Sequence, residues 1–129
     1  MKRLLVGLVL TVLVAAGVDA LADLTQDRAD HVVPGSRSQI VLHVASRDRT
    51  GSAVLSAQGL WGACQGTVWQ RLADPGVVDI GAGRFQMTTE PAIGEHSWRR
   101  LQGCLEDTTL DLVKGHVVSK TDLPPAPPG

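Results

Sequence analysis

The first 22 residues constrain this chain most, because their pattern sets them apart from any globular core. Lys2 and Arg3 form a basic head, and an uncharged run follows from Leu4 to Val18. Ala20-Leu21-Ala22 then supplies the small-residue pattern that precedes a signal-peptidase cleavage site. We predict an N-terminal apolar helix over residues 1–22 that is either a cleaved signal peptide or an uncleaved signal anchor held in the membrane. Both alternatives place the folded part outside the cytoplasm, secreted or anchored.

The chain beyond this segment suffices for one modest domain. It has 107 residues and, without Lys2, Arg3 and Asp19, carries 10 basic and 12 acidic side chains. A net charge of about −2 argues against a nucleic-acid-binding protein, which would need a basic excess. Aromatic residues are scarce, so the core must consist mainly of aliphatic side chains.

Composition divides this remainder into three parts. Residues 23–38 are polar and contain Pro34-Gly35, so we predict a stalk or linker there. Residues 39–121 carry the periodic patterns of a small α+β domain. Residues 122–129 are rich in proline, which cannot donate to a sheet ladder, and we predict a disordered, extended tail.

The periodic patterns predict an order of strand, helix, strand, strand, helix, strand. The apolar periodicity predicts strands at 39–45, 67–72 with 77–80, 84–89 and 113–120, and helices near 53–64 and 95–106. Gly81-Ala82-Gly83 indicates a hairpin turn. Two right-handed strand–helix–strand units predict a split βαβ (ferredoxin-like) fold, a four-stranded antiparallel sheet with both helices on one face.

Alternation within the strands predicts which side chains form the core. On the first strand, Ile40, Leu42 and Val44 share one face, and His43 belongs to the other. The expected core has eight members: Ile40, Leu42, Val44, Trp61, Phe85, Met87, Trp98 and Leu101.

The two cysteines predict a covalent link between the two helices. Cys64 ends the first predicted helix, and Cys104 lies within the second. In an exported protein a single pair of thiols normally forms a disulfide, and helices that are neighbours over a sheet can be bridged. Neither a CxxC spacing nor a nearby histidine favours a metal or redox site.

Candidate functional residues are few. The first and last strands should be neighbours, so His43 and His116 could face each other on the open side of the sheet, provided that Val117 points into the core. Two imidazoles there would form a transition-metal or pH-sensitive pair. Arg99 and Arg100 on the second helix could hold an anionic group, but a solvated helix face with Glu95 paired to Arg99 is the favoured explanation.

The sequence contains no Gly-x-Ser-x-Gly nucleophile motif. Gly81-Ala82-Gly83 does not indicate a phosphate loop, because a hairpin and not a helix follows it. We therefore expect a non-catalytic binding module at the cell envelope, with no cofactor, that takes an envelope protein or a small ligand. The alternative is a metal-dependent or enzymatic protein that uses the His43/His116 pair. We expect a monomer or a weak homodimer, and contact with the membrane through the N-terminal segment if it stays uncleaved.

Overall fold

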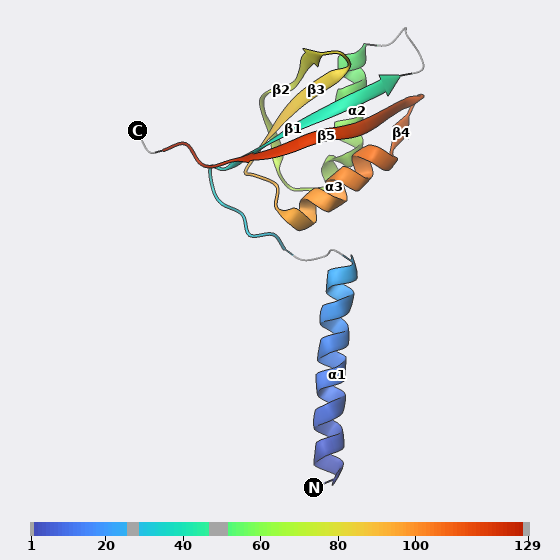
Figure 1. Cartoon of the computed structure of the whole chain (residues 1–129), viewed down its shortest axis with the longest axis vertical. Helices are drawn as coiled ribbons and strands as arrows, with labels where there is room; N and C mark the ends of the chain where they lie inside the picture. The colour runs from blue at the N-terminus through green and yellow to red at the C-terminus, as the bar shows by residue number, and fades with distance from the viewer. Residues whose placement is uncertain (1, 26–28, 47–51, 128–129) are drawn as a thin grey trace.

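The computed structural model describes residues 2–25, 29–46 and 52–127, and it shows an α+β protein. Three α-helices and one five-stranded antiparallel sheet make up this part of the chain (Figure 1). The helices are α1 (Lys2–Thr25), α2 (Ala53–Cys64), followed by a short 3-10 turn η1 (Gln65–Thr67), and α3 (Glu95–Asp107). The strands are β1 (Arg37–Ser46), β2 (Arg71–Gly81), β3 (Arg84–Glu90), β4 (Thr109–Leu110) and β5 (Val113–Leu123).

The N-terminal segment forms α1, which Figure 1 shows as a separate helix away from the sheet. Its side chains from Val6 to Leu21 are exposed. Within the described ranges of the chain, no helix meets the length and apolarity that a membrane crossing requires.

The sheet has five strands in the order β2-β3-β1-β5-β4, and every neighbouring pair is antiparallel. The predicted count of four strands is therefore wrong. The added strand is β4, which pairs with the first residues of β5 across Asp111 and Leu112. Both turn residues have positive φ, 44° and 67°, and the pattern missed the turn because leucine rarely adopts this conformation. The first and last long strands are predicted to be neighbours in the sheet, and the β1–β5 pairing confirms this.

The hairpin between β2 and β3 forms where the glycines predict it. Gly81 pairs with Arg84, and Ala82 and Gly83 between them both have positive φ, as two-residue hairpin turns require. The pieces expected at 67–72 and 77–80 are instead one strand, β2, which begins at Arg71 and whose register shifts between Leu72 and Val77.

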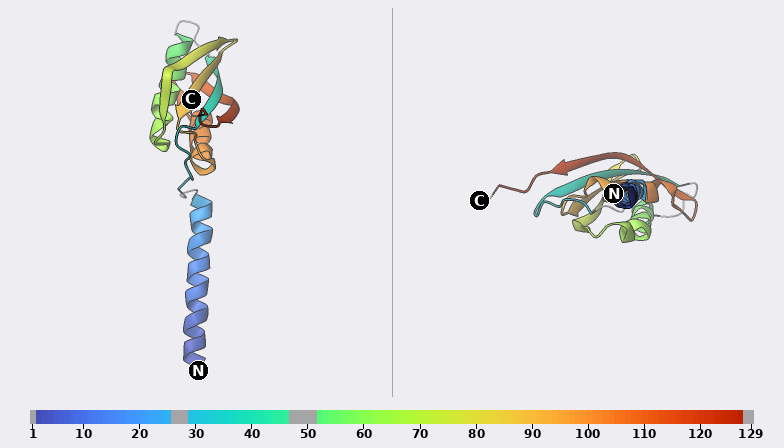
Figure 2. Two further views of the ribbon diagram at one scale, coloured as in Figure 1. Left: turned by 90° about the vertical axis from the view of Figure 1, so that its left-hand side faces the viewer. Right: turned by 90° about the horizontal axis from the view of Figure 1, so that it is seen from below.

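One hydrophobic core lies between the sheet and the two helices. Ile40, Leu42 and Val44 of β1 are buried with residues of β3, α2 and α3 in a single cluster, so both helices pack on the same face (Figure 2). Seven of the eight predicted core side chains are buried. Trp98 is the exception: it is half-buried, because its ring lies at the margin of the core with the Lys120 ammonium 5.7 Å from its centroid.

The predicted disulfide is present between Cys64 and Cys104. It joins the last residue of α2 to the third turn of α3, with a Cα–Cα distance of 5.7 Å, and Cys64 is fully buried. The bridge therefore fixes the two helices to each other on the covered face of the sheet.

The domain extends further in both directions than composition indicates. β1 begins at Arg37, inside the predicted stalk, and β5 continues to Leu123, inside the predicted tail. At the start of β1, the Ser36 hydroxyl accepts a hydrogen bond from the Ala92 backbone N–H, and the Ser38 hydroxyl accepts one from the Ile93 backbone N–H. Residues 124–127 are exposed and have no regular secondary structure, and 128–129 lie outside the described residues.

Candidate binding surface on the open sheet face

The face of the sheet opposite the helices is uncovered. It presents the alternate residues of each strand, beginning with Gln39, Val41, His43 and Ala45 on β1. Among the described elements, α2 and α3 both lie on the other side (Figure 2). The fold therefore leaves this face of the sheet accessible.

His43 and His116 are directly opposite each other on the open face. They are register partners in the β1–β5 pairing, at the end of β1 that is far from the linker. Both line a hollow of about 350 Å³, together with Ala45, Glu106, Asp107, Lys114 and Gly115.

The register shift between β1 and β5 sets this arrangement. It falls at Val41/Leu42, and it leaves Val117 paired with Leu42 and packed against the core while Val118 is 50% exposed. A bulge of this kind adds one residue to a strand and reverses the facing of those beyond it. Val117 therefore points inward, which is the condition for His116 to lie on the open face.

Glu106 contributes a carboxylate to this hollow from the end of α3. Its Oε1 atom accepts a hydrogen bond of 3.2 Å from the Val117 backbone N–H and lies 3.4 Å from Nδ1 of His116. The carboxylate satisfies a backbone donor on the outer edge of β5, which β4 no longer covers at this point. The sequence singled out His116 but not this partner.

Basic side chains of three strands lie next to the hollow, whose other wall carries Glu106 and Asp107. Arg84 on β3 is the register partner of His43, so Arg84, His43 and His116 form a row across three strands. Lys114 is paired with Ala45 next to this row. In the part of the chain that the structure describes, neither Arg84 nor Lys114 makes an ion pair.

The described residues around the histidine pair do not form a complete set of metal ligands. Across 2–25, 29–46 and 52–127, no group of three or more histidine, cysteine, aspartate or glutamate side chains is placed to hold a metal ion. The paired imidazoles could supply two ligands, and the other coordination positions would fall to water.

Arg99 and Arg100 lie on α3, on the opposite side of the sheet from the histidine pair. Arg99 forms an ion pair with Glu95 one turn earlier, and Arg100 donates a hydrogen bond of 3.1 Å to the Ser97 hydroxyl. The four predicted surface residues therefore do not form one site. The arrangement of Arg99 agrees with a solvated, internally paired helix face.

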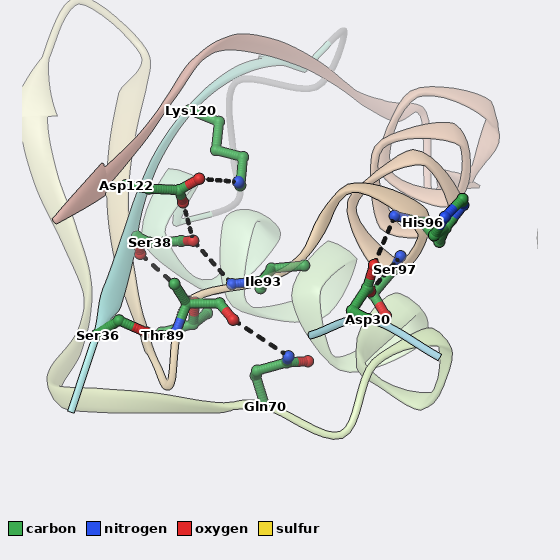
Figure 3. A network of polar contacts seen from close by, with 11 residues as sticks. Asp30, Ser36, Ser38, Gln70, Thr89, Ile93, His96, Ser97, Lys120 and Asp122 are labelled. Atoms are coloured by element: carbon green, nitrogen blue, oxygen red, sulfur yellow. Dashed lines mark hydrogen bonds and ion pairs between the residues drawn. The ribbon is translucent and has the colours of Figure 1, made fainter. Parts of the chain in front are cut away.

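A second polar cluster, which the sequence did not reveal, joins the start of β1 to the end of β5 (Figure 3). The Ser38 hydroxyl donates to Asp122 and accepts from the Ile93 N–H at 2.9 Å, and Lys120 lies 2.6 Å from the other Asp122 oxygen. Thr89 donates to the Ser38 carbonyl at 3.5 Å. The polar groups of this cluster bond to one another, so we assign the cluster a stabilising role and not a binding role.

The N-terminus of α3 is capped from outside the helix. Its own N-cap position is Gly94, which has no side chain, and the Asp30 carboxylate instead accepts hydrogen bonds from the backbone N–H groups of His96 (2.9 Å) and Ser97 (2.8 Å) (Figure 3). Burial raises the pKa of Asp30, but hydrogen bonds from Ser97 and His96 and the charge of His96 outweigh this effect and hold the pKa below its ordinary value. The segment before β1 is thereby docked onto the domain.

We predict that Asp30→Ala lowers the free energy of unfolding by about 1 kcal/mol, the usual cost of losing a helix cap. Because the folded pKa is depressed, the carboxylate stabilises the fold fully above the ordinary aspartate pKa of about 4, and this contribution is lost as the pH falls through the lowered value. Urea unfolding at pH 7 and pH 3 should therefore show a difference in the free energy of unfolding between wild type and Asp30→Ala that becomes smaller in acid.

Gly94 provides the matched control for this cap. A Cβ atom there would lie 2.3 Å from the Asp30 Cβ, so Gly94→Ser alone should destabilise the protein. Combined with Asp30→Gly, the same serine has room and can cap α3 itself, so the double variant should be more stable than Asp30→Gly. A difference in unfolding free energy between wild type and Asp30→Ala that does not change with pH, or the absence of rescue in the double variant, would show that Asp30 does not act as the cap.

Comparison of the chain with protein-family models, with curated proteins and with solved structures gives no match.

Proposed function

We propose that this chain is a small exported or membrane-tethered domain of the cell envelope that acts by binding and not by catalysis. Its disulfide is compatible with an oxidising, extracytoplasmic compartment, where such bridges persist. The basic head, apolar run and small-residue end of residues 1–22 support export by a signal peptide or signal anchor. We further propose that the sheet is a ferredoxin-like one with β4 added, on the support of the order β2-β3-β1-β5.

The binding surface that we propose is the open sheet face, and its occupant is an acidic segment of an envelope protein. The observation that carries this proposal is the basic row of Arg84, His43 and His116 with Lys114 beside it, on a face that no described helix covers. The chain as a whole is slightly acidic, with a net charge of −1, so this basic face is a local feature. Charge complementarity of this kind steers association and selects the partner.

Two acidic side chains from the end of α3, Glu106 and Asp107, line the histidine hollow at the edge of the open face, and Glu106 lies 3.4 Å from Nδ1 of His116. Glu95 and Asp107 are on α3, and Asp111 is in the turn between β4 and β5. On the open face, Glu90 is paired with Arg37 at 3.0 Å. An acidic partner segment would therefore be attracted by Arg84 and Lys114 on the open face and repelled by the carboxylates at the end of α3, which favours binding across the sheet over binding along α3.

Photocrosslinking in the native envelope tests this proposal. A photoreactive residue at Gln86, which is the register partner of Val41 on the open face, should form an adduct with a partner protein. The matched control is Gln58, an exposed position on α2. We expect the Gln86 adduct to be lost when Arg84→Glu and Lys114→Glu are introduced together and to persist with Arg99→Glu. Equal adducts from both positions, or an adduct insensitive to the open-face charges, would contradict the proposal.

A second candidate function is metal-dependent activity at the His43/His116 pair. The observation that favours it is the direct register pairing of the two imidazoles within one hollow. Metal analysis of protein purified from its native compartment distinguishes the two candidates. A stoichiometric transition metal that is absent from His116→Ala supports the metal-dependent function, and no stoichiometric metal supports the binding module.

A further inference from the structure

Trp69 is exposed in a chain that has very few aromatic residues. Of the four aromatic side chains, Phe85 and Trp61 are buried and Trp98 is half-buried, whereas Trp69 is 62% exposed. It lies in the connection between η1 and β2. An indole ring is the largest apolar surface that a side chain can bury, so this ring represents unused binding area.

A hollow of about 410 Å³ lies beside the Trp69 ring. Trp61 contributes to its wall from the core side, and Gln65 and Arg71 are exposed hydrogen-bond donors around it. The other lining residues are Val68, Gln70 and Leu72. This combination of aromatic faces with a few amide and guanidinium donors is typical of a site for an extended peptide.

The connection that carries Trp69 is anchored at its start. Cys64 precedes it and is linked to α3 by the disulfide, and the Thr67 hydroxyl donates a hydrogen bond of 2.8 Å to the Cys64 carbonyl. The Val68 N–H donates to the Gln65 carbonyl at 3.2 Å. The hollow is therefore formed before a ligand arrives, which lowers the entropic cost of binding.

The chain itself contains a segment with the complementary chemistry. Residues 123–128 read Leu-Pro-Pro-Ala-Pro-Pro, and 124–127 are exposed without regular secondary structure. Proline-rich segments adopt an extended polyproline II helix that has no internal hydrogen bonds, so their carbonyl groups remain free acceptors. Their flat rings pack on aromatic side chains, and their stiffness leaves little conformational entropy to lose.

We propose that the Trp69 hollow binds the proline-rich segment of a second copy of this chain. The segment of the same copy leaves the sheet from β5, which is separated from β2 by both β3 and β1. Its first prolines, Pro124 and Pro125, lie instead in a separate hollow with Val33 and Ile93. Reciprocal exchange of the two segments closes a twofold dimer. This inference is independent of the proposed acidic partner, because Arg84, His43, His116 and Lys114 do not line the Trp69 hollow.

Sedimentation equilibrium of the full chain in detergent tests this exchange. We expect a weak monomer–dimer equilibrium whose dissociation constant rises at least tenfold in Trp69→Ala and in the triple variant Pro124→Ala, Pro125→Ala and Pro127→Ala. Leu55→Ala is the matched control, because it removes a side chain that is 65% exposed on α2, away from the hollow, and it should leave the equilibrium unchanged. Circular dichroism verifies that each variant is folded.

Mixing the variants makes the test sharper. The Trp69→Ala chain keeps its proline-rich segment, and the triple proline variant keeps its Trp69 hollow. The mixture should therefore form heterodimers through this one contact, and these should be more stable than the dimers of either variant alone. The peptide Leu-Pro-Pro-Ala-Pro-Pro-Gly should also change the tryptophan fluorescence of the wild type and not that of Trp69→Ala. Self-association that survives both variants, or no response to millimolar peptide, would overturn the proposal. A response to an envelope polysaccharide but not to the peptide would do the same and would identify a sugar as the occupant.

Discussion

Replacing both Cys64 and Cys104 with alanine should lower the free energy of unfolding by about 4 kcal/mol. The bridge closes a loop with a sequence separation of 40 residues, and the chain-entropy model gives about this value for a loop of that length. The total stability of a small domain is about 5–15 kcal/mol, so the loss would be a large share of it. The effect is large because the unbridged unfolded chain gains conformational freedom and α2 and α3 lose the disulfide that holds them together.

Urea unfolding of the double variant and the wild type, followed by circular dichroism, measures this loss. The double variant is the correct comparison, because removing one cysteine would leave a free thiol in its partner. A difference below about 1 kcal/mol would show that the disulfide does not restrict the unfolded chain as the loop length predicts.

Leu42→Ala should cost about 2–5 kcal/mol, the range for a leucine removed from a well-packed core. Leu42 is fully buried and is the register partner of both Phe85 on β3 and Val117 on β5. Gly115 lies so close that a Cβ atom there would be 3.2 Å from a Leu42 methyl group, so the surrounding chain has little freedom to fill the cavity.

The adjacent residue supplies the control for this substitution. His43→Ala alters the same strand on its open face and should cost about 0.5 kcal/mol or less. Thermal unfolding of the two variants should therefore differ clearly. Similar losses for Leu42→Ala and His43→Ala would mean that the two faces of β1 are not distinct, and the covered and open sides of the sheet would have to be reassigned.

Features with a local signal could be predicted from the sequence. The period-2 alternation of Ile40, Leu42 and Val44 identified the covered face of β1, and the glycines at 81 and 83 identified a hairpin. Helical spacing placed Cys64 and Cys104 on two helices close enough to be bridged. Each of these inferences depends on residues a few positions apart, where backbone geometry fixes the side-chain direction.

Features that depend on distant or atypical residues could not be predicted. Asp30 caps a helix whose own start, Gly94, lies 64 positions later, and only the missing cap side chain at Gly94 hinted at an external hydrogen-bond acceptor. β4 was missed because Leu112 occupies a turn conformation that leucine rarely adopts. For the binding surface, the facing of His116 depended on a register shift at Val41/Leu42 that no local pattern revealed.

An NMR titration with a hexaglutamate peptide tests whether the open sheet face receives an acidic partner segment. We expect the largest amide shifts at His43, Arg84 and His116, with small shifts along α2 and α3, and a return toward the free spectrum when salt is added. Shifts centred on Arg99 and Arg100 of α3, or no shifts at millimolar peptide and low salt, would contradict the account.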